Sequence, residues 1–175
     1  MEGPLRERRG PCGAQLRPLH SRRAARGRDR GDPALRRSGL SVRLTKKVAR
    51  LIDRERVCRV ATTNAAGMPH LVPVCQVVAD GKIYFASGDD GRKALNLAAN
   101  PQVAVTVDLY SDDWSNIKGV MVQGRATLHA RGPRFRKIRA LLYRKYPQYA
   151  RDAAISESDS VVVEVTPGRV FTWGF

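Results

Sequence analysis

The residues best suited to chemistry in this 175-residue chain are Gly91, Arg92 and Lys93, which follow a run of strand-forming residues. The spacing of apolar residues after them predicts a short helix over residues 89–101. The first turn of a helix has unpaired N–H groups and a positive dipole, so a guanidinium and an ammonium placed there would bind phosphate. Ser87, at the end of the preceding strand, would add a hydroxyl. A solvated pair is the alternative, but two cations oppose the helix dipole, so we expect an anion there.

Other familiar sites lack their sequence signatures. The histidines, His20, His70 and His129, are widely separated and have no neighbouring cluster of cysteines or carboxylates, so no metal site is expected. The chain also lacks the glycine-rich motifs of nucleotide hydrolases and dinucleotide-binding domains, and the G-x-S-x-G motif of serine hydrolases. No catalytic acid or base is identified. Tyr110, Asp113 and His70 are candidates only because they could face a bound ligand.

The elements that must position the cation pair are mostly strands. Runs rich in β-branched residues predict six strands, over 57–63, 68–78, 82–87, 102–110, 118–130 and 160–165, and residues 169–175 could extend the sheet. Helices are expected over 41–52, 89–101 and 133–146. Because the strands connect mostly to their sequence neighbours, the fold class expected is mainly β with helices: an antiparallel six-stranded barrel whose ends the helices cover.

Composition divides the chain into two parts. Residues 1–40 contain 11 arginines and 4 acidic residues among scattered glycines and prolines, so they predict a disordered N-terminal arm, and residues 41–175 form the predicted domain. The net charge of +16 favours anionic partners such as phosphates, acidic cofactors or nucleic acid. Nucleic acid is disfavoured for the arm because no aromatic residue lies among its arginines to stack on bases.

Cysteine content and hydropathy bear on location. Cys12, Cys58 and Cys75 are too few for a secreted disulfide-bonded scaffold, so we expect a cytoplasmic protein. The chain has no apolar run near the roughly 20 residues that a membrane-spanning helix needs, and no secretory signal is expected. A membrane partner is therefore not predicted.

An ordered series of motifs resembles the pyridoxamine 5′-phosphate oxidase-like split-barrel flavoproteins. The motifs are R-V-C-R-V-A-T-T-N-A-A-G-M-P-H-L-V-P-V at 56–74, I-Y-F-A-S-G-D-D-G-R-K-A-L-N-L-A-A-N-P-Q-V-A-V-T-V-D at 83–108 and V-M-V-Q-G-R-A at 120–126. The resemblance covers about residues 42–175. Within the family, V-D-L-Y-S-D-D-W-S at 107–115 and Y-P-Q-Y at 146–149 are similar to the branch of deazaflavin (coenzyme F-420) dependent oxidoreductases. The resemblance to this family implies an FMN-binding type of split β-barrel and a homodimer with two cofactor sites at the subunit interface.

The resemblance also implies site residues. Arg92 and Lys93 match the family's phosphate-binding pair, and Ser87 matches a residue on the strand that follows the ring-contacting strand. The segment that runs beside the isoalloxazine ring is matched by His70, Leu71, Val72, Pro73, Val74 and Cys75. Trp173 matches a tryptophan that reaches the flavin of the partner subunit, and a core aromatic residue is the alternative.

The expected function is that of an enzyme, an oxidoreductase that moves a hydride between FMN or coenzyme F-420 and an unidentified small molecule. Vitamin B6 oxidation is not expected. Gly119 and Tyr146 stand where pyridoxine phosphate oxidases have a flavin-contacting glutamine and a substrate arginine, and Phe175 ends the chain before their substrate-binding segment. Two alternatives stay open: a noncatalytic protein that stores or senses flavin or haem on the same barrel, and a nucleic-acid-binding protein.

Overall fold

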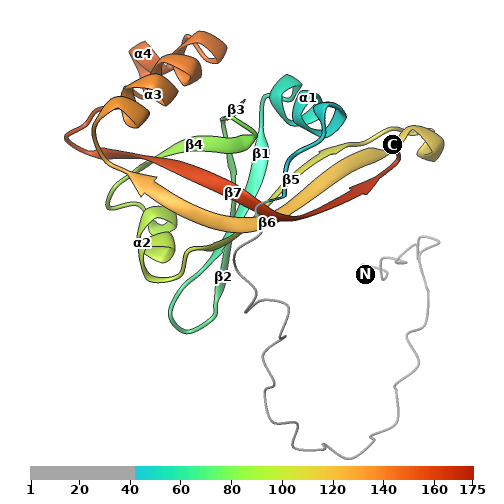
Figure 1. Ribbon diagram of the computed structural model, residues 1–175, viewed down its shortest axis with the longest axis horizontal. Coiled ribbons are helices and arrows are strands. Elements are labelled where there is room, and N and C mark those ends of the chain that lie inside the picture. The colour runs from blue at the N-terminus through green and yellow to red at the C-terminus, as the bar shows by residue number, and fades with distance from the viewer. Residues whose placement is uncertain (1–41) are drawn as a thin grey trace, which may run out of the picture. The chain divides into compact units, whose positions relative to one another are not determined.

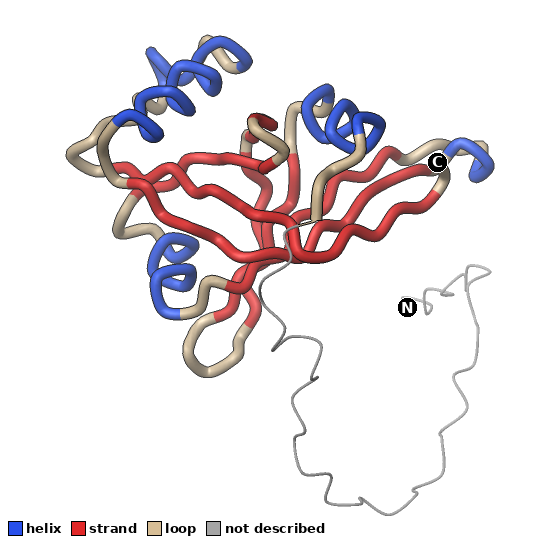
Figure 2. Tube along the Cα trace, in the orientation of Figure 1, coloured by secondary structure: helices blue, strands red, loops and turns tan. Residues whose placement is uncertain are grey.

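The computed structural model describes residues 42–175, and the arm predicted over residues 1–40 lies outside the described residues (Figure 1). Strands dominate the described part, as Figure 2 shows. The elements in chain order are α1 (Lys46–Arg54), β1 (Cys58–Thr63), β2 (Pro69–Val74), β3 (Gln76–Ala79), β4 (Lys82–Gly88), α2 (Arg92–Ala99), β5 (Gln102–Leu109), the 3₁₀ helix η2 (Trp114–Asn116), β6 (Lys118–His129), α3 (Pro133–Lys145), α4 (Tyr149–Asp152) and β7 (Ser160–Trp173).

The strands form one antiparallel sheet in the order β2-β1-β5-β6-β7-β4-β3. Its two edge strands, β2 and β3, are consecutive in the chain and separated by Cys75 alone. One bent segment therefore serves both edges, and the sheet curls into a split β-barrel, which confirms the expected fold class. The strand predicted over 68–78 is broken at this point, so the described residues contain seven strands where six were expected.

Buried polar contacts hold the break at Cys75. The side-chain amide of Gln76 donates to the backbone oxygens of Ile52 (2.7 Å) and Glu55 (2.8 Å). The backbone N–H of Gln76 donates to the Tyr146 hydroxyl (3.1 Å), and this hydroxyl donates to the Gln76 carbonyl oxygen (2.8 Å). Tyr146 follows α3 directly and is 1% exposed. An unpaired buried polar group costs about 1–3 kcal/mol, so these contacts fix the position of the break.

The helices pack on both faces of the sheet. The barrel interior is filled by valines of the sheet together with apolar residues of α1 and α2, including Leu51, Ile52 and Leu97. The opposite face of β4 and β7 carries α3, which buries Phe135 and two further residues against it. Thus α1 and α2 pack against the interior of the barrel, whereas α3, which was also expected to cover a barrel end, packs against the outer face (Figure 1). Leu141 of α3 is half-buried.

The last strand is longer than predicted. β7 continues to Trp173 and pairs with β6 from Val162 to Trp173, with a register shift between Gln123 and Gly124. Gly124 permits this shift, because a Cβ there would collide with the backbone oxygen of Thr166. Pro167 therefore lies within the strand, at the bulge, where a missing N–H donor is tolerated.

A buried carboxylate fastens β4, β6 and β7 together. Glu164 on β7 forms an ion pair with Lys82 on β4. Its other oxygen accepts from the Tyr84 hydroxyl (3.2 Å) and lies 3.1 Å from His129 Nε2 on β6. Burial, together with the neighbouring Glu164 charge, raises the pKa of Tyr84 to about 12, so this hydroxyl remains a donor.

Candidate functional site

The cation pair singled out from the sequence lies at the first two positions of α2. Gly91 is the N-cap residue and offers no side-chain hydrogen bond, and the first turn contains no acidic residue. Because a helix leaves its first N–H groups without intrahelical partners, the start of α2 presents unpaired donors beside Arg92 and Lys93. Arg92 is exposed and Lys93 is half-buried. The start of α2 therefore combines the positive end of the helix dipole with two cationic side chains.

The Ser87 hydroxyl lies against this helix start. Ser87 is 8% exposed, and its Oγ is the one buried side-chain oxygen or nitrogen within residues 42–175 that has no hydrogen-bond partner. A Cβ placed on Gly91 would lie 3.1 Å from this Oγ and 3.0 Å from the Gly88 carbonyl oxygen. A side chain at this N-cap position would therefore press against the Ser87 hydroxyl and the Gly88 carbonyl oxygen. A buried hydroxyl without a partner costs about 1–3 kcal/mol, so the position fits a bound acceptor such as phosphate.

A cavity of about 240 Å³ opens beside the start of α2. It brings together His70 from β2 and Arg92 from α2, and it is lined by Asn64, Met68, Pro69, His70, Arg92 and Asn96. Buried side chains hold α2 in this place, because Asn96 Nδ2 donates to Thr62 Oγ1 (3.0 Å) on β1. Thr62 is paired with His70 in the sheet, so this bond fixes the distance between α2 and β2.

Four lining residues were not identified from the sequence. Asn96 lies four residues after Arg92, on the same helix face, so helical spacing could have found it. Asn64 and Met68 belong to the turn between β1 and β2, where Asn64 Oδ1 accepts from the Met68 N–H (2.9 Å). Tertiary packing brings this turn beside the start of α2, and the local sequence carries no signal for that packing.

The remaining predicted residues of β2 lie along one edge of the sheet. Within the described residues β2 pairs with β1 alone, so its outer edge presents backbone N–H and C=O groups that the sheet does not use. Leu71 and Pro73 are exposed, and Val72 and Val74 are half-buried, as is Cys75. None of the five lines the cavity around Arg92, although four of them follow His70 on β2 and Cys75 comes directly after that strand.

Trp173 lies far from the cation pair within one chain. β7 begins at Ser160, which pairs with Gly88 near the start of α2, and Trp173 follows 13 residues later, about 40 Å along the strand. Its ring is 40% exposed and covers Gly119, where any Cβ would collide with it. The single chain brings His70 and Arg92 into one cavity, whereas Ser87 and Lys93 adjoin the same helix start without lining that cavity. Trp173 lies at the other end of β7.

The other candidates for proton transfer lie outside the cavity. Asp113 caps η2, accepting from the Ser115 hydroxyl (2.8 Å), the Ser115 N–H (3.0 Å) and Asn116 Nδ2 (2.9 Å). The two bonds from Ser115, that of the hydroxyl first, hold the pKa of the Asp113 carboxyl below its usual value, so it stays ionised. Tyr110 is exposed on the loop before η2. Neither residue lines the cavity with His70 and Arg92.

Metal and membrane features were also sought in the part of the chain that the structure describes. No group of three or more histidine, cysteine, aspartate or glutamate side chains there is placed to hold a metal ion. No helix among residues 42–175 is long and apolar enough to cross a membrane.

Comparisons with known proteins agree with this fold. A family model described as pyridoxamine 5′-phosphate oxidase matches residues 44–174. A search of curated proteins gave no match. Among solved structures, a conserved hypothetical protein from Mycobacterium tuberculosis is 20% identical, with a TM-score of 0.65, and the match covers 76% of this chain and 86% of that one. The heme storage protein HutZ from Vibrio cholerae is 18% identical, with a TM-score of 0.65 and coverage of 77% and 97%. An F420 reductase is 19% identical, with a TM-score of 0.59 and coverage of 73% and 98%.

Proposed function

The chain belongs to the pyridoxamine 5′-phosphate oxidase family, and we propose that it is an oxidoreductase that uses bound FMN or coenzyme F-420 to transfer a hydride to or from a small molecule. The observation that carries the proposal is the buried, unpartnered hydroxyl of Ser87 at the uncapped start of α2. Arg92 and Lys93 add positive charge at the same place. This donor set matches the phosphate that both cofactors contain.

Each residue of the site has a distinct role in this proposal. Arg92, Lys93 and the first N–H groups of α2 hold the phosphate, and Ser87 donates its hydroxyl to it. His70, in the same cavity, lies where an imidazole N–H can donate to the cofactor, and the free edge of β2 offers backbone groups to the ring. When bound, the flavin or deazaflavin ring supplies the hydride chemistry, and the protein orients it and limits the access of water.

A second copy of the chain would complete the site. Trp173 cannot reach the start of α2 in its own chain, since the two are about 40 Å apart along β7. Exposed aromatic side chains accompany it, at Tyr110, Trp114, Phe171 and Phe175. Exposed aromatic residues are enriched at protein interfaces, which supports a homodimer with Trp173 near the partner's cofactor. Sedimentation should give about twice 19.4 kDa. A monomer that still binds cofactor would contradict this arrangement.

Gly119 supports a substrate other than a vitamin B6 compound. The Trp173 ring occupies the space that any side chain at position 119 would need. A glutamine at this position, as in the pyridoxine phosphate oxidases, therefore cannot be accommodated without moving the tryptophan. We infer that the reacting face of the cofactor is shaped differently here and accepts a different small molecule.

The thiols support a reducing, cytoplasmic location. Cys58 and Cys75 are both free, although they lie on neighbouring strand segments. Burial raises the pKa of the Cys58 thiol to about 12, so it stays protonated and unreactive.

A noncatalytic store of haem or flavin is the second candidate function. The structural similarity to a protein named as a heme storage protein favours it, and so does His70 in the cavity, because imidazole is a common axial ligand of haem iron. This candidate predicts binding without turnover. The oxidoreductase and the storage function can therefore be distinguished by which ligand binds and by whether the bound ligand reacts.

Titration of the purified full-length protein with FMN, coenzyme F-420 and hemin tests the proposal. We expect FMN or F-420 to bind one site per chain, and the bound cofactor, once chemically reduced, to be reoxidised by a panel of small-molecule acceptors faster than the free cofactor. Hemin binding alone would favour storage and contradict the oxidoreductase. Binding of none of the three would contradict both candidates.

A further inference from the structure

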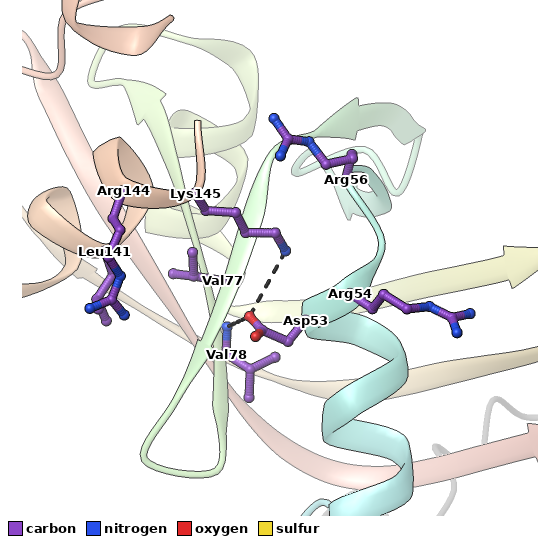
Figure 3. A pocket seen from close by; sticks show the side chains of 8 residues that line it. All are labelled: Asp53, Arg54, Arg56, Val77, Val78, Leu141, Arg144 and Lys145. Atoms are coloured by element: carbon purple, nitrogen blue, oxygen red, sulfur yellow. Dashed lines mark hydrogen bonds and ion pairs between the residues drawn. The ribbon is translucent and has the colours of Figure 1, made fainter. Parts of the chain in front are cut away.

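A second cavity, of about 360 Å³, lies between α1, β3 and α3 (Figure 3). It shares no lining residue with the cavity around Arg92. Four of its lining residues are cationic, namely Arg54, Arg56, Arg144 and Lys145, and Asp53 is the one acidic residue among them. Its size is at the lower end of the roughly 300–1,000 Å³ of small-molecule sites.

The Lys145 ammonium is directed into this cavity, as Figure 3 shows. Its side chain is 15% exposed, and Nζ donates to the backbone oxygen of Glu55 (2.9 Å) and lies 3.9 Å from Asp53 Oδ1. Asp53 Oδ1 also accepts from the Val78 N–H (3.3 Å), so this carboxylate is fixed to β3. The Asp53 carboxylate thus offsets only part of the charge. Burial lowers the pKa of Lys145, an effect that a bound anion would oppose.

Two further cationic side chains border the cavity, Arg56 and Arg144, and Figure 3 shows them on opposite sides of Lys145. Within the described residues, neither Arg56 nor Arg144 forms an ion pair with an acidic side chain. Arg56 lies over the Tyr146 ring, 4.8 Å from its centroid, which restricts the guanidinium to the rim of the cavity. Arg54 differs, because it points away from the cavity and pairs with Glu55 (3.1 Å).

Apolar side chains form the rest of the wall. Val77 and Val78 come from β3, and Leu141 comes from α3. Leu141 is half-buried although it lies on the core-facing side of its helix, because it borders this cavity. An apolar wall beside three cations is suited to a ligand with an anionic group and an apolar body.

We propose that this cavity is a second anion site, which binds a small phosphate monoester. The phosphate binds at Lys145, with Arg56 and Arg144 turning in from opposite sides of the cavity to reach it, and the apolar part of the ester lies against Val77 and Leu141. Arginine forks and a lysine ammonium together match the oxygens and the double charge of such a group. The proposal does not depend on the proposed oxidoreductase function, because the two cavities have no residue in common.

Phenyl phosphate is the probe, measured by calorimetric titration of the full chain. The background variant Arg92→Ala/Lys93→Ala removes the phosphate donors of α2, and we expect one binding event to remain in it. In that background Arg144→Gln should weaken binding about fivefold, as expected for one partly solvated charge contact to phosphate. Arg144 is exposed and without an acidic partner, so its replacement should leave folding intact. Lys145→Gln should weaken binding at least as much.

The matched control is Arg50→Gln, which removes one exposed charge from α1 outside the cavity. Its affinity for phenyl phosphate should stay within about twofold of the background. Equal weakening by Arg50→Gln and Arg144→Gln would mean nonspecific attraction and would overturn the proposal. Loss of all binding in the Arg92→Ala/Lys93→Ala background would also overturn it. Inorganic phosphate binding as tightly as phenyl phosphate would contradict the role of the apolar wall.

Discussion

Replacing Ser87 with alanine should change the stability of the cofactor-free protein and its cofactor affinity in opposite directions. The Ser87 Oγ is buried without a partner, so its removal relieves the cost of an unsatisfied hydroxyl, about 1 kcal/mol. For a domain of this size that gain corresponds to a rise in melting temperature of about 4 °C. The same hydroxyl is proposed to donate to the cofactor phosphate. Loss of a bond to a charged acceptor, about 1.5 kcal/mol, should weaken cofactor binding about tenfold.

Thermal denaturation without cofactor and fluorescence titration with cofactor measure the two effects separately. Ser160→Ala is the matched control, because the Ser160 hydroxyl has hydrogen-bond partners. It accepts from the Ser156 N–H (3.3 Å) and donates to Asp159 Oδ1 (2.7 Å). The control should lower the melting temperature and leave cofactor affinity nearly unchanged. A Ser87→Ala protein that melts lower than wild type, or that binds cofactor with wild-type affinity, would refute the reasoning.

Three further changes test the packing of the fold. Tyr146→Phe leaves the buried Gln76 N–H without its acceptor and should lower the free energy of unfolding by about 2 kcal/mol in urea denaturation; a change near zero would contradict the role given to this contact. Gly119→Val should displace the Trp173 ring, seen as a red shift of tryptophan emission and a lower melting temperature, and an unchanged spectrum would be inconsistent with the packing. Burial disfavours ionised Glu164, but hydrogen bonds from a lysine and a histidine outweigh it and hold its pKa below the usual 4.5. The stabilisation from ionised Glu164 is therefore present above pH 4.5 and is lost as the pH falls through the lower folded-state pKa. Glu164→Gln should reduce the free energy of unfolding at pH 7 and make it less dependent on pH in the acid range. An unchanged dependence on pH would contradict this.

Local signals were sufficient to predict the start of α2. Gly91 after a strand, followed by apolar residues at helical spacing, placed Arg92 and Lys93 in the first turn, where the structure has them. The turn between β3 and β4 is also local, since Asp80 and Gly81 both adopt the positive φ that a tight hairpin turn requires. Each of these features depends on residues only a few positions apart.

Tertiary contacts decided what the sequence pattern could not predict. The run 68–78 reads as one strand, and its break depends on Tyr146, which lies 70 residues after Gln76. The predicted strand ended at residue 165, but a bulge opposite Gly124 lets β7 continue through Pro167. The cavity that joins Asn64 to α2 likewise depends on sheet pairing, for which periodicity alone gives no information.

Fluorescence titration of FMN and coenzyme F-420 against wild type and Arg92→Ala/Lys93→Ala is the most direct test of a phosphate site at the start of α2. Two charge-assisted contacts to phosphate, about 1.5–3 kcal/mol each, predict cofactor binding weaker by about 100-fold or more. The cofactor-free melting temperature should stay the same or rise slightly, because two cations leave the positive end of a helix. Arg136→Ala/Lys137→Ala on α3 removes the same charge elsewhere and should change affinity by no more than about twofold. Equal affinity of the Arg92→Ala/Lys93→Ala variant and wild type for both cofactors would contradict the account.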